Sequence, residues 1–293
     1  IYNLVTALLD PGDEAIIPAP YWVSYPDMVL LADGVPVTVY AGPEQGYKIT
    51  PAQLAAAITP KTRLFFLNSP SNPTGAAYTR AELRALGAVL AQHPRIVIAT
   101  DDMYEHVWWG AEPFCSLVTA CPDLYDRTVT INGVSKSYAM TGWRIGYCGG
   151  PRELIAAMAT VQGQSTSNAS SISQRAAVAA LDGDQACVAR MNEAFKERHD
   201  FVVAGLNALP GVSCLPGWGT FYAFANVEGA MRRLGCADDN AFAERLLAEA
   251  LVEFGVFVVA EAFVIAADGA EGRDAHQGVV AMIDEAPLAC APM

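Results

Sequence analysis

The sequence predicts an α/β fold in which a mostly parallel sheet is flanked by helices, followed by a smaller α+β domain. Short runs of β-branched and aromatic residues alternate with longer segments of helical periodicity over the first part of the chain. Several of the short runs are almost entirely apolar, which is typical of strands that helices cover on both faces. We expect a large domain over residues 1–185 and a smaller one over 186–293.

The elements of the large domain follow from the local patterns. Helices are predicted at 50–58, 79–92 and 151–162, and the second begins at a capping-box pair, Thr79 and Glu82. Ligands of parallel sheets bind near the carboxyl ends of the strands, so polar side chains just after the strands are candidates for a site. The predicted strands are 14–18, 35–40, 63–67, 96–100, 128–131 and 145–148.

The second domain begins with a long amphipathic pattern over 184–209, which ends at Pro210 and Gly211. The segment GTFYAF, a helix at 240–250 and an apolar strand near 256–259 follow. These patterns favour the smaller α+β unit.

Composition excludes several kinds of protein. The 293 residues carry a net charge of −13, which argues against a nucleic acid or an anionic membrane as partner. The seven cysteines form no CxxC pair and the four histidines have no ligand spacing, so no metal site is expected. Scattered cysteines without a signal peptide predict a cytoplasmic location.

The segment NGVSKSYAMTGWRIGY, residues 132–147, contains the clearest chemical candidates. It places Lys136 just after a predicted strand and Arg144 beyond a turn that contains glycine. A lysine in a dry turn has a lowered pKa, which suits a lysine that forms a Schiff base. Taken alone, however, a single lysine is more often one whose ammonium reaches solvent.

Four other side chains are predicted near strand ends. Asp101 could pair with a protonated ring nitrogen or cap a helix, and Tyr104 could hydrogen-bond a ring oxygen. Asn72 lies in NSPSNPTG, where the simpler interpretation is a turn. Trp22 could stack on a planar ligand or belong to the core. Each signal is weak alone, but all four positions should converge at one edge of the sheet.

The combined motifs resemble the class I aminotransferases, which depend on pyridoxal phosphate. GVSKSYAMTGWRIG, residues 133–146, is similar to the cofactor attachment motif of that family, and NPTG and DDMY follow its order and approximate spacing. LLDPGDEAIIPAPYWVSYPDMV and STSNASSISQRAAVAAL look most like the bacterial aspartate aminotransferase branch. The resemblance extends from residue 1 to about residue 259 and implies the large domain of a fold type I enzyme.

The resemblance also implies a role for each candidate residue. Lys136 would hold pyridoxal 5'-phosphate covalently and then act as the catalytic base. Arg144 and Ser135 would bind its phosphate, and Asp101 would keep its pyridine nitrogen protonated. Tyr104 and Asn72 would bind the ring's phenolic oxygen and Trp22 would stack on the ring, with Trp22 and Asn72 also contacting substrate. The expected partners are an amino acid, a 2-oxo acid and a second copy of the chain.

The sequence departs from the family pattern at three places. It begins after the position of a Gly-rich phosphate loop, and Gly133 stands where a hydroxyl residue is usual. After about residue 260 the tail diverges and offers no strand of the form R-x-S-[YF]-A, whose arginine binds the substrate carboxylate. Arg273 is the last arginine and lies in a loop-like segment. These departures predict reduced activity for the chain as printed.

Three functions stay open at this level. The first is an aminotransferase with aspartate-like specificity, and the second is a carbon–sulfur β-lyase that uses the same cofactor and fold. The third is a truncated, non-catalytic protein of this fold. A nicotinamide enzyme is disfavoured because no G-x-G-x-x-G follows a strand, and a serine hydrolase because GVSKS misses G-x-S-x-G.

Overall fold

The computed structural model describes residues 1–254 and 278–282. In that part of the chain, a six-stranded sheet has the order β2-β1-β3-β4-β5-β6, and all its strands are parallel except β6, which runs antiparallel to β5. The six predicted strands are confirmed, each bound to within two residues. They are β1 Glu14–Ala19, β2 Val35–Tyr40, β3 Thr62–Asn68, β4 Val97–Asp101, β5 Thr128–Gly133 and β6 Gly146–Gly149.

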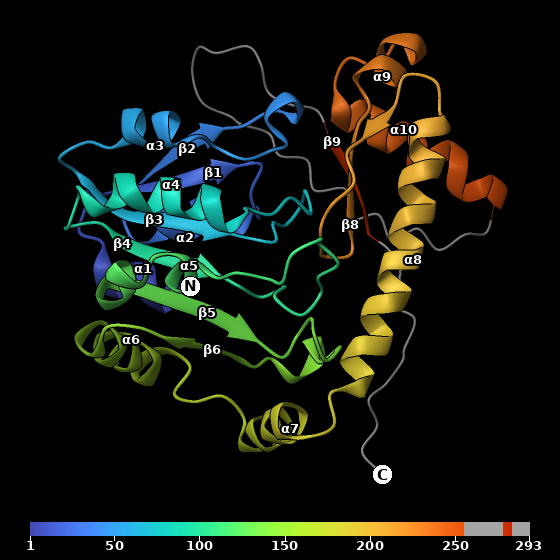
Figure 1. The fold of residues 1–293 in the computed structure, drawn as a ribbon. Helices are drawn as coiled ribbons and strands as arrows, with labels where there is room; N and C mark the ends of the chain where they lie inside the picture. Colours follow the sequence, from blue (N-terminus) through green and yellow to red (C-terminus); the bar gives the residue numbers. More distant parts are fainter. Residues whose placement is uncertain (255–277, 283–293) are drawn as a thin grey trace.

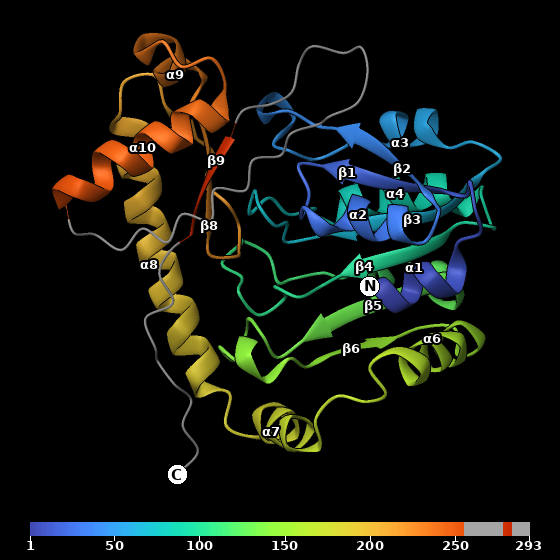
Figure 2. The ribbon, with the colours of Figure 1, turned by 180° about the vertical axis from the view of Figure 1, so that it is seen from behind.

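Helices cover both faces of this sheet (Figures 1 and 2). α1 (Tyr2–Leu8), α2 (Ser24–Leu31) and α6 (Arg152–Ser165) pack on one face, and α3 (Pro51–Ala57), α4 (Arg80–Ala91) and α5 (Leu117–Ala120) pack on the other. Alternation along β3 supplies both cores, because Leu64 and Phe66 join one and Phe65 and Leu67 join the other. The central strands β1, β3 and β4 are largely apolar and mostly buried, as expected for strands that helices cover on both faces.

The local signals for the predicted helices are also confirmed. The side chains of Thr79 and Glu82 form the expected capping box at the start of α4, and Thr50 and Gln53 form another at α3. The sequence analysis missed five helices and three short 3-10 turns. They are α1, α2, α5, α7 (Ser171–Asp182), α9 (Glu228–Leu234), η1 Pro43–Gln45, η2 Pro122–Arg127 and η3 Thr141–Trp143. Except for α7, these elements have eight residues or fewer, so periodicity gave little signal for them.

A second group of elements packs beside the strand ends (Figure 1). The long helix α8 (Ala186–Ala208) lies against β7 (Ser213–Cys214) and β8 (Tyr222–Asn226), and their buried core includes Val203, Ala223 and Phe242. α9 (Glu228–Leu234) and α10 (Asp239–Phe254) complete the group. The domain boundary between residues 185 and 186 stays a prediction. The strand predicted at 256–259 lies outside the described residues.

The structure describes one strand after residue 259. β9 (Gly278–Met282) pairs antiparallel with β8 along five residues, which gives the sheet order β7-β8-β9. Its sequence, GVVAM, contains two adjacent β-branched valines, which favour extended structure. The strand contains no arginine. β9 is therefore not a strand of the form R-x-S-[YF]-A, in agreement with the sequence analysis.

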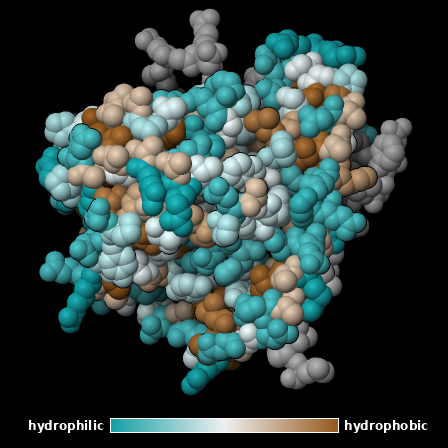
Figure 3. Space-filling view, viewed as in Figure 1, coloured by the Kyte–Doolittle hydropathy of each residue, from teal (hydrophilic) through white to brown (hydrophobic). Residues whose placement is uncertain are grey.

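The surface of the described part is mixed in character. On the face shown in Figure 3, hydrophobic residues form separate groups among hydrophilic ones. None of the described helices combines the length and the apolar character that crossing a membrane requires.

Candidate active site

A cavity of about 590 Å³ opens at the carboxyl ends of the parallel strands. All seven residues predicted from the sequence line it: Trp22, Asn72, Asp101, Tyr104, Ser135, Lys136 and Arg144. Ligand pockets commonly have volumes of roughly 300–1,000 Å³, so this cavity has room for a cofactor-sized molecule.

The sheet topology explains why residues far apart in the sequence meet here. Trp22 follows β1, Asn72 follows β3, Asp101 is the last residue of β4, and Lys136 lies three residues beyond β5. These four strands are parallel, so their carboxyl ends share one edge. Arg144 precedes β6, which is antiparallel and therefore begins at the same edge (Figure 1).

Asp101 is a buried carboxylate at this edge. The hydroxyl of Tyr25 donates a hydrogen bond of 2.7 Å to its Oδ2 atom, and the backbone N–H of Met103 lies 3.3 Å from Oδ1. Burial raises the pKa of Asp101 above its ordinary value, while the hydrogen bonds from Tyr25 and Met103 act in the opposite direction. No basic side chain among the described residues forms an ion pair with it. The site therefore suits a cationic ligand group.

Tyr104 presents a second buried polar group to the cavity. Its hydroxyl lies 2.8 Å from the hydroxyl of Tyr222, a residue of β8 that also lines the cavity. Burial, with the neighbouring Tyr222 hydroxyl, raises the pKa of Tyr104 well above its ordinary value. Tyr104 therefore remains a neutral hydrogen-bond donor over the pH range in which most proteins work.

The loop that carries Asn72 is tied to Asp101 through Asn68. The side-chain amide of Asn68 donates to the backbone oxygen of Asp101 at 2.9 Å, and its Oδ1 accepts the backbone N–H of Asn72 at 2.7 Å. One asparagine at the end of β3 thus fixes both loops. The side chain of Asn72 itself faces the cavity among its lining residues.

The turn that carries Lys136 packs against the helices α7 and α8. Val134, Tyr138 and Met140 are buried against Ala177 of α7 and Val188 of α8. The Lys136 ammonium lies 5.2 Å from the centroid of the buried Phe221 ring. This packing fixes the turn, and with it the position of Lys136 in the cavity lining.

Gly133, where the family usually has a hydroxyl residue, is enclosed by backbone. A Cβ atom at this position would lie 3.0 Å from the carbonyl oxygen of Ile145 and 3.2 Å from the Cα atom of Gly146. Gly133 pairs with Gly146 across β5 and β6. A side chain here therefore requires its backbone neighbours to shift by a few tenths of an ångström.

Arg144 and Ser135 line the same cavity as Lys136. Arg144 adopts the left-handed conformation with φ of 56°, an uncommon one for a residue other than glycine. Its Nη1 donates to the backbone oxygen of Thr141 at 3.0 Å, which leaves most of the five guanidinium donors for an anion. The residue is exposed, so an anion can reach these donors.

The sequence analysis missed several residues of this site. Tyr25 and Asn68 bind Asp101, Phe221 lies beside Lys136, and Tyr222 binds Tyr104. Tyr25 and Asn68 stand within or next to segments already noted, PYWVSYP and NSPSNPTG, at strand ends. Phe221 and Tyr222 come from the second group of elements, and no pattern in the sequence indicated that GTFYAF would face the sheet.

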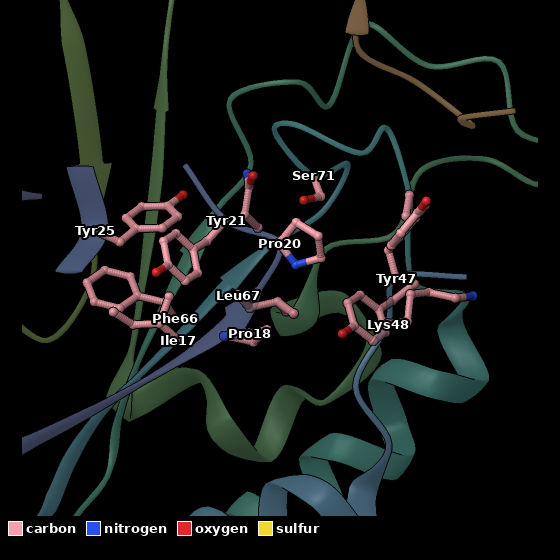
Figure 4. Close-up of a pocket in the computed structure, with 13 residues that line it drawn as sticks. Ile17, Pro18, Pro20, Tyr21, Tyr25, Tyr47, Lys48, Phe66, Leu67 and Ser71 are labelled. Carbon is pink, nitrogen blue, oxygen red and sulfur yellow. The ribbon is translucent and has the colours of Figure 1, made fainter. Parts of the chain in front are cut away.

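A second, much smaller cavity lies beside the first (Figure 4). It has a volume of about 20 Å³ and shares Tyr25 and Asn68 with the larger one. A space of that size holds about one water molecule, so it offers no ligand site.

The comparisons with known proteins show the family of the chain. The model of the family described as aminotransferase class I and II matches residues 1–271. The chain belongs to this family. It is 56% identical over 257 residues to the aspartate/prephenate aminotransferase of Nitrosomonas europaea, which covers 86% of this chain and 65% of that protein. It is 48% identical to the aspartate aminotransferase of Geobacillus stearothermophilus, over 86% of this chain and 64% of that protein.

Solved structures of this aminotransferase family give the same result. The aspartate aminotransferase from Rhizobium meliloti has a TM-score of 0.81 and 49% identity, covering 85% of this chain and 64% of that one. The Thermus thermophilus aspartate aminotransferase with maleate has a TM-score of 0.77 and 40% identity, over 84% and 63%. The fold is therefore that of these aminotransferases. The chain spans about two thirds of the length of such relatives, slightly less in each case.

Arg273, the weak candidate for the carboxylate-binding arginine, lies outside the described residues. The family match ends at residue 271, just before it.

Proposed function

We propose that this chain is the cofactor-binding part of a pyridoxal-phosphate-dependent aminotransferase that moves an amino group between an aspartate-like amino acid and a 2-oxo acid. The observation that carries the proposal is one cavity lined by both a buried carboxylate, Asp101, and a lysine, Lys136. A carboxylate and a lysine at one planar ligand are what this chemistry requires.

The residues present fit pyridoxal phosphate. Asp101 is a buried carboxylate that forms no ion pair with a described basic side chain, which suits a protonated pyridine nitrogen. Tyr104 supplies a neutral phenol and Asn72 an amide for the ring oxygen. Arg144 keeps guanidinium donors for the phosphate, with Ser135 as a second donor, and Trp22 offers an aromatic face.

The residues would divide the work as follows. When bound, pyridoxal phosphate withdraws electrons from the substrate α-carbon and so weakens its C–H bond. Asp101 holds the proton on the ring nitrogen, which maintains that withdrawal. Lys136 would remove the proton from the substrate α-carbon with its Nζ atom. It would then deliver the proton to the C4′ position of the cofactor, not back to the same carbon. Arg144 and Ser135 hold the phosphate, so that the reacting carbon stays near Lys136.

The substrate class rests on the relatives. The proteins from Nitrosomonas europaea and Cereibacter sphaeroides are named aspartate/prephenate aminotransferases, and the Thermus thermophilus structure contains maleate, a dicarboxylate. We therefore favour aspartate as the amino donor. Nothing in the site favours the carbon–sulfur β-lyase.

We also propose a homodimer, as the resemblance implies. Apolar side chains remain exposed on α7, where Ile172, Val178 and Leu181 are 79%, 48% and 41% exposed. A second copy is one partner that would cover them. Sedimentation of the purified chain tests this, and a monomer at all concentrations would contradict it.

The function is tested with the purified chain, pyridoxal phosphate and aspartate, with and without 2-oxoglutarate. We expect oxaloacetate to accumulate beyond one equivalent only when the 2-oxo acid is present. An Asp101→Asn variant should lose most of this activity because an amide does not stabilise a pyridinium cation. Release of pyruvate and thiol from a cysteine thioether without any 2-oxo acid would instead indicate the β-lyase.

A further inference from the structure

We propose that Tyr25 is a positioning residue that holds the carboxylate of Asp101 in place and ionised opposite the pyridine nitrogen of the cofactor. This inference rests on the proposed function, because it assigns Tyr25 a task only if a pyridine nitrogen binds at Asp101. The resemblance gave roles to Trp22 and Asp101 and none to Tyr25.

The geometry fixes the Tyr25 hydroxyl against Asp101. The two side chains come from α2 and β4, 76 residues apart, and their oxygen atoms lie 2.7 Å apart. Tyr25 is only 2% exposed, so water does not compete for the contact. A hydrogen bond to a charged group in such surroundings is stronger than one between neutral groups.

The ring of Tyr25 is clamped between two other aromatic rings. It stacks on Phe66 of β3 with centroids 4.9 Å apart and an interplanar angle of 22°, and it meets Trp22 edge to face at 5.4 Å. Figure 4 shows the Tyr25 ring next to Phe66 among the residues that line the small cavity. Tyr25 therefore has little freedom to turn away from Asp101, and it links Asp101 to the aromatic residue proposed to stack on the cofactor.

The direction of the hydrogen bond is also determined. Burial first, and then the charge of Asp101, raise the pKa of Tyr25 well above its ordinary value, so its oxygen keeps its proton and donates it. Such a bond favours the ionised form of Asp101 and opposes the effect of burial. Among the other titratable groups, the amino group of Ile1 lowers the pKa of Asp101, and Asp101 in turn raises the pKa of Asp102 and Tyr104. None of these donates a hydrogen bond to its carboxylate in the described structure.

The consequence concerns one shared proton. With pyridoxal phosphate bound, a proton between the ring nitrogen and Asp101 rests on the nitrogen only while the carboxylate remains the weaker base. The Tyr25 hydrogen bond stabilises the carboxylate. Hydrogen bonds to charged groups contribute about 1.5 kcal/mol or more, so losing this one should shift the proton about tenfold toward Asp101.

The first arm of the test needs no cofactor. The pKa of Asp101 is measured by carbon NMR of labelled carboxyl groups, with the signal assigned by its absence in Asp101→Asn. We expect a higher pKa in Tyr25→Phe than in the unaltered chain, since phenylalanine keeps the ring contacts and removes the donor. Tyr78→Phe is the matched control, because it removes another buried hydroxyl, which accepts the N–H of Ile49. An Asp101 pKa that is the same in Tyr25→Phe and in the control would overturn the proposal.

A second substitution moves the same quantity in the other direction. A fluorinated tyrosine at position 25 is a stronger hydrogen-bond donor and keeps the whole side chain, so it should lower the pKa of Asp101 below that of the unaltered chain. A purely structural role for Tyr25 predicts no such decrease. This arm also decides the question if Tyr25→Phe does not fold.

The second arm uses pyridoxal phosphate labelled at its ring nitrogen. In the unaltered chain and in Tyr78→Phe we expect the NMR signal of a protonated nitrogen, and in Tyr25→Phe a shift toward the unprotonated form. If the unaltered chain binds no pyridoxal phosphate, the proposed function fails and takes this inference with it. If it binds and Tyr25→Phe gives the unaltered signal, only the inference fails.

Discussion

Asp101 and Asp102 are adjacent carboxylates with different surroundings. Asp101 faces the cavity and receives the Tyr25 hydroxyl, whereas Asp102 is buried away from the cavity lining and accepts a hydrogen bond of 2.6 Å from Thr100. Burial first, with the charges of Asp101 and Glu105, raises the pKa of Asp102 to about 7. Two neighbouring acids thus have different tasks: one can face a ligand cation, and the other titrates near neutral pH.

The raised pKa of Asp102 predicts a pH dependence of stability. Between pH values near the ordinary pKa of about 3.8 and the folded value of about 7, the folded chain holds a proton that the unfolded chain has lost. The free energy of unfolding should therefore fall as the pH rises through this window, by on the order of 4 kcal/mol for a shift of this size. In Asp102→Asn this contribution disappears.

Urea unfolding at pH 5 and pH 8 measures this fall in the free energy of unfolding. The unaltered chain should lose more stability across this interval than Asp102→Asn, and an equal loss in both would show that Asp102 is ionised throughout.

The site residues could be predicted because their signals are local. Lys136, Arg144, Asp101 and Asn72 each stand at a strand end in a motif, and the parallel sheet brings strand ends together. Tyr25 and Tyr222 could not be assigned in the same way. Their tasks depend on one hydrogen bond each to residues 76 and 118 positions away, and spacing along the chain carries no information about such a pair.

At the scale of elements, the turn after β5 determines where Lys136 lies. Its buried residues pack on α7 and α8, and the Tyr138 hydroxyl donates to Gln185 at 2.8 Å. The strands themselves were predictable to within two residues because a sheet buried on both faces requires continuous apolar runs. α7 was not predicted. Its one buried residue, Ala177, packs on this turn, and the sequence carries no signal for that contact.

Gly133→Ser tests how closely that turn is fitted. The added Cβ would approach the backbone of Ile145 and Gly146, which cannot rotate away as a side chain can. We expect a loss of about 1–3 kcal/mol in unfolding free energy and weaker cofactor binding, since overpacking moves the turn.

Gly142→Ser is the control in the same segment, because a Cβ there meets nothing within 4 Å. If both variants match the unaltered chain in urea unfolding and cofactor affinity, then the strands β5 and β6 separate easily and the fit at Gly133 is unimportant.

At the scale of the whole molecule, a glycine contact joins the sheet to the second group of elements. Gly75, in the turn after β3, meets Gly217, and the backbone N–H of Trp218 donates to the Gly75 oxygen at 2.9 Å. The backbone N–H of Trp109 also donates to the oxygen of Trp218, and that of Thr220 donates to the oxygen of Val107, each at 2.9 Å, so the segment after β4 is joined as well. This contact holds β8, and with it Phe221 and Tyr222, against the cavity.

Gly217→Ala should weaken this contact. Its Cβ would lie 3.0 Å from the Cα atom of Gly75 and 3.1 Å from the Gly75 oxygen. We expect a loss of about 1–3 kcal/mol in urea unfolding. Gly163→Ala is the control, because a Cβ at this exposed position of α6 meets nothing and alanine favours a helix. The same stability change in both variants would contradict a close approach at Gly217.

The arrangement of the second group could be predicted only in part. The long helix α8 and the strand β8 have clear patterns, but β9 pairs with β8 across more than 50 residues of sequence. Non-local pairing of a five-residue strand leaves almost no local signal. The contact between Phe221 and Lys136 is also non-local, so the sequence did not indicate it.

The central claim is that Lys136 holds pyridoxal phosphate covalently. The chain has four lysines, Lys48, Lys61, Lys136 and Lys196, so peptide mapping separates them readily. The purified chain is mixed with pyridoxal phosphate, reduced with borohydride, digested and analysed by mass spectrometry. We expect the pyridoxyl label on Lys136, whereas Lys48, whose ammonium is paired with Glu82 at 2.7 Å, should remain unlabelled. A label on another lysine, with none on Lys136, would contradict the account.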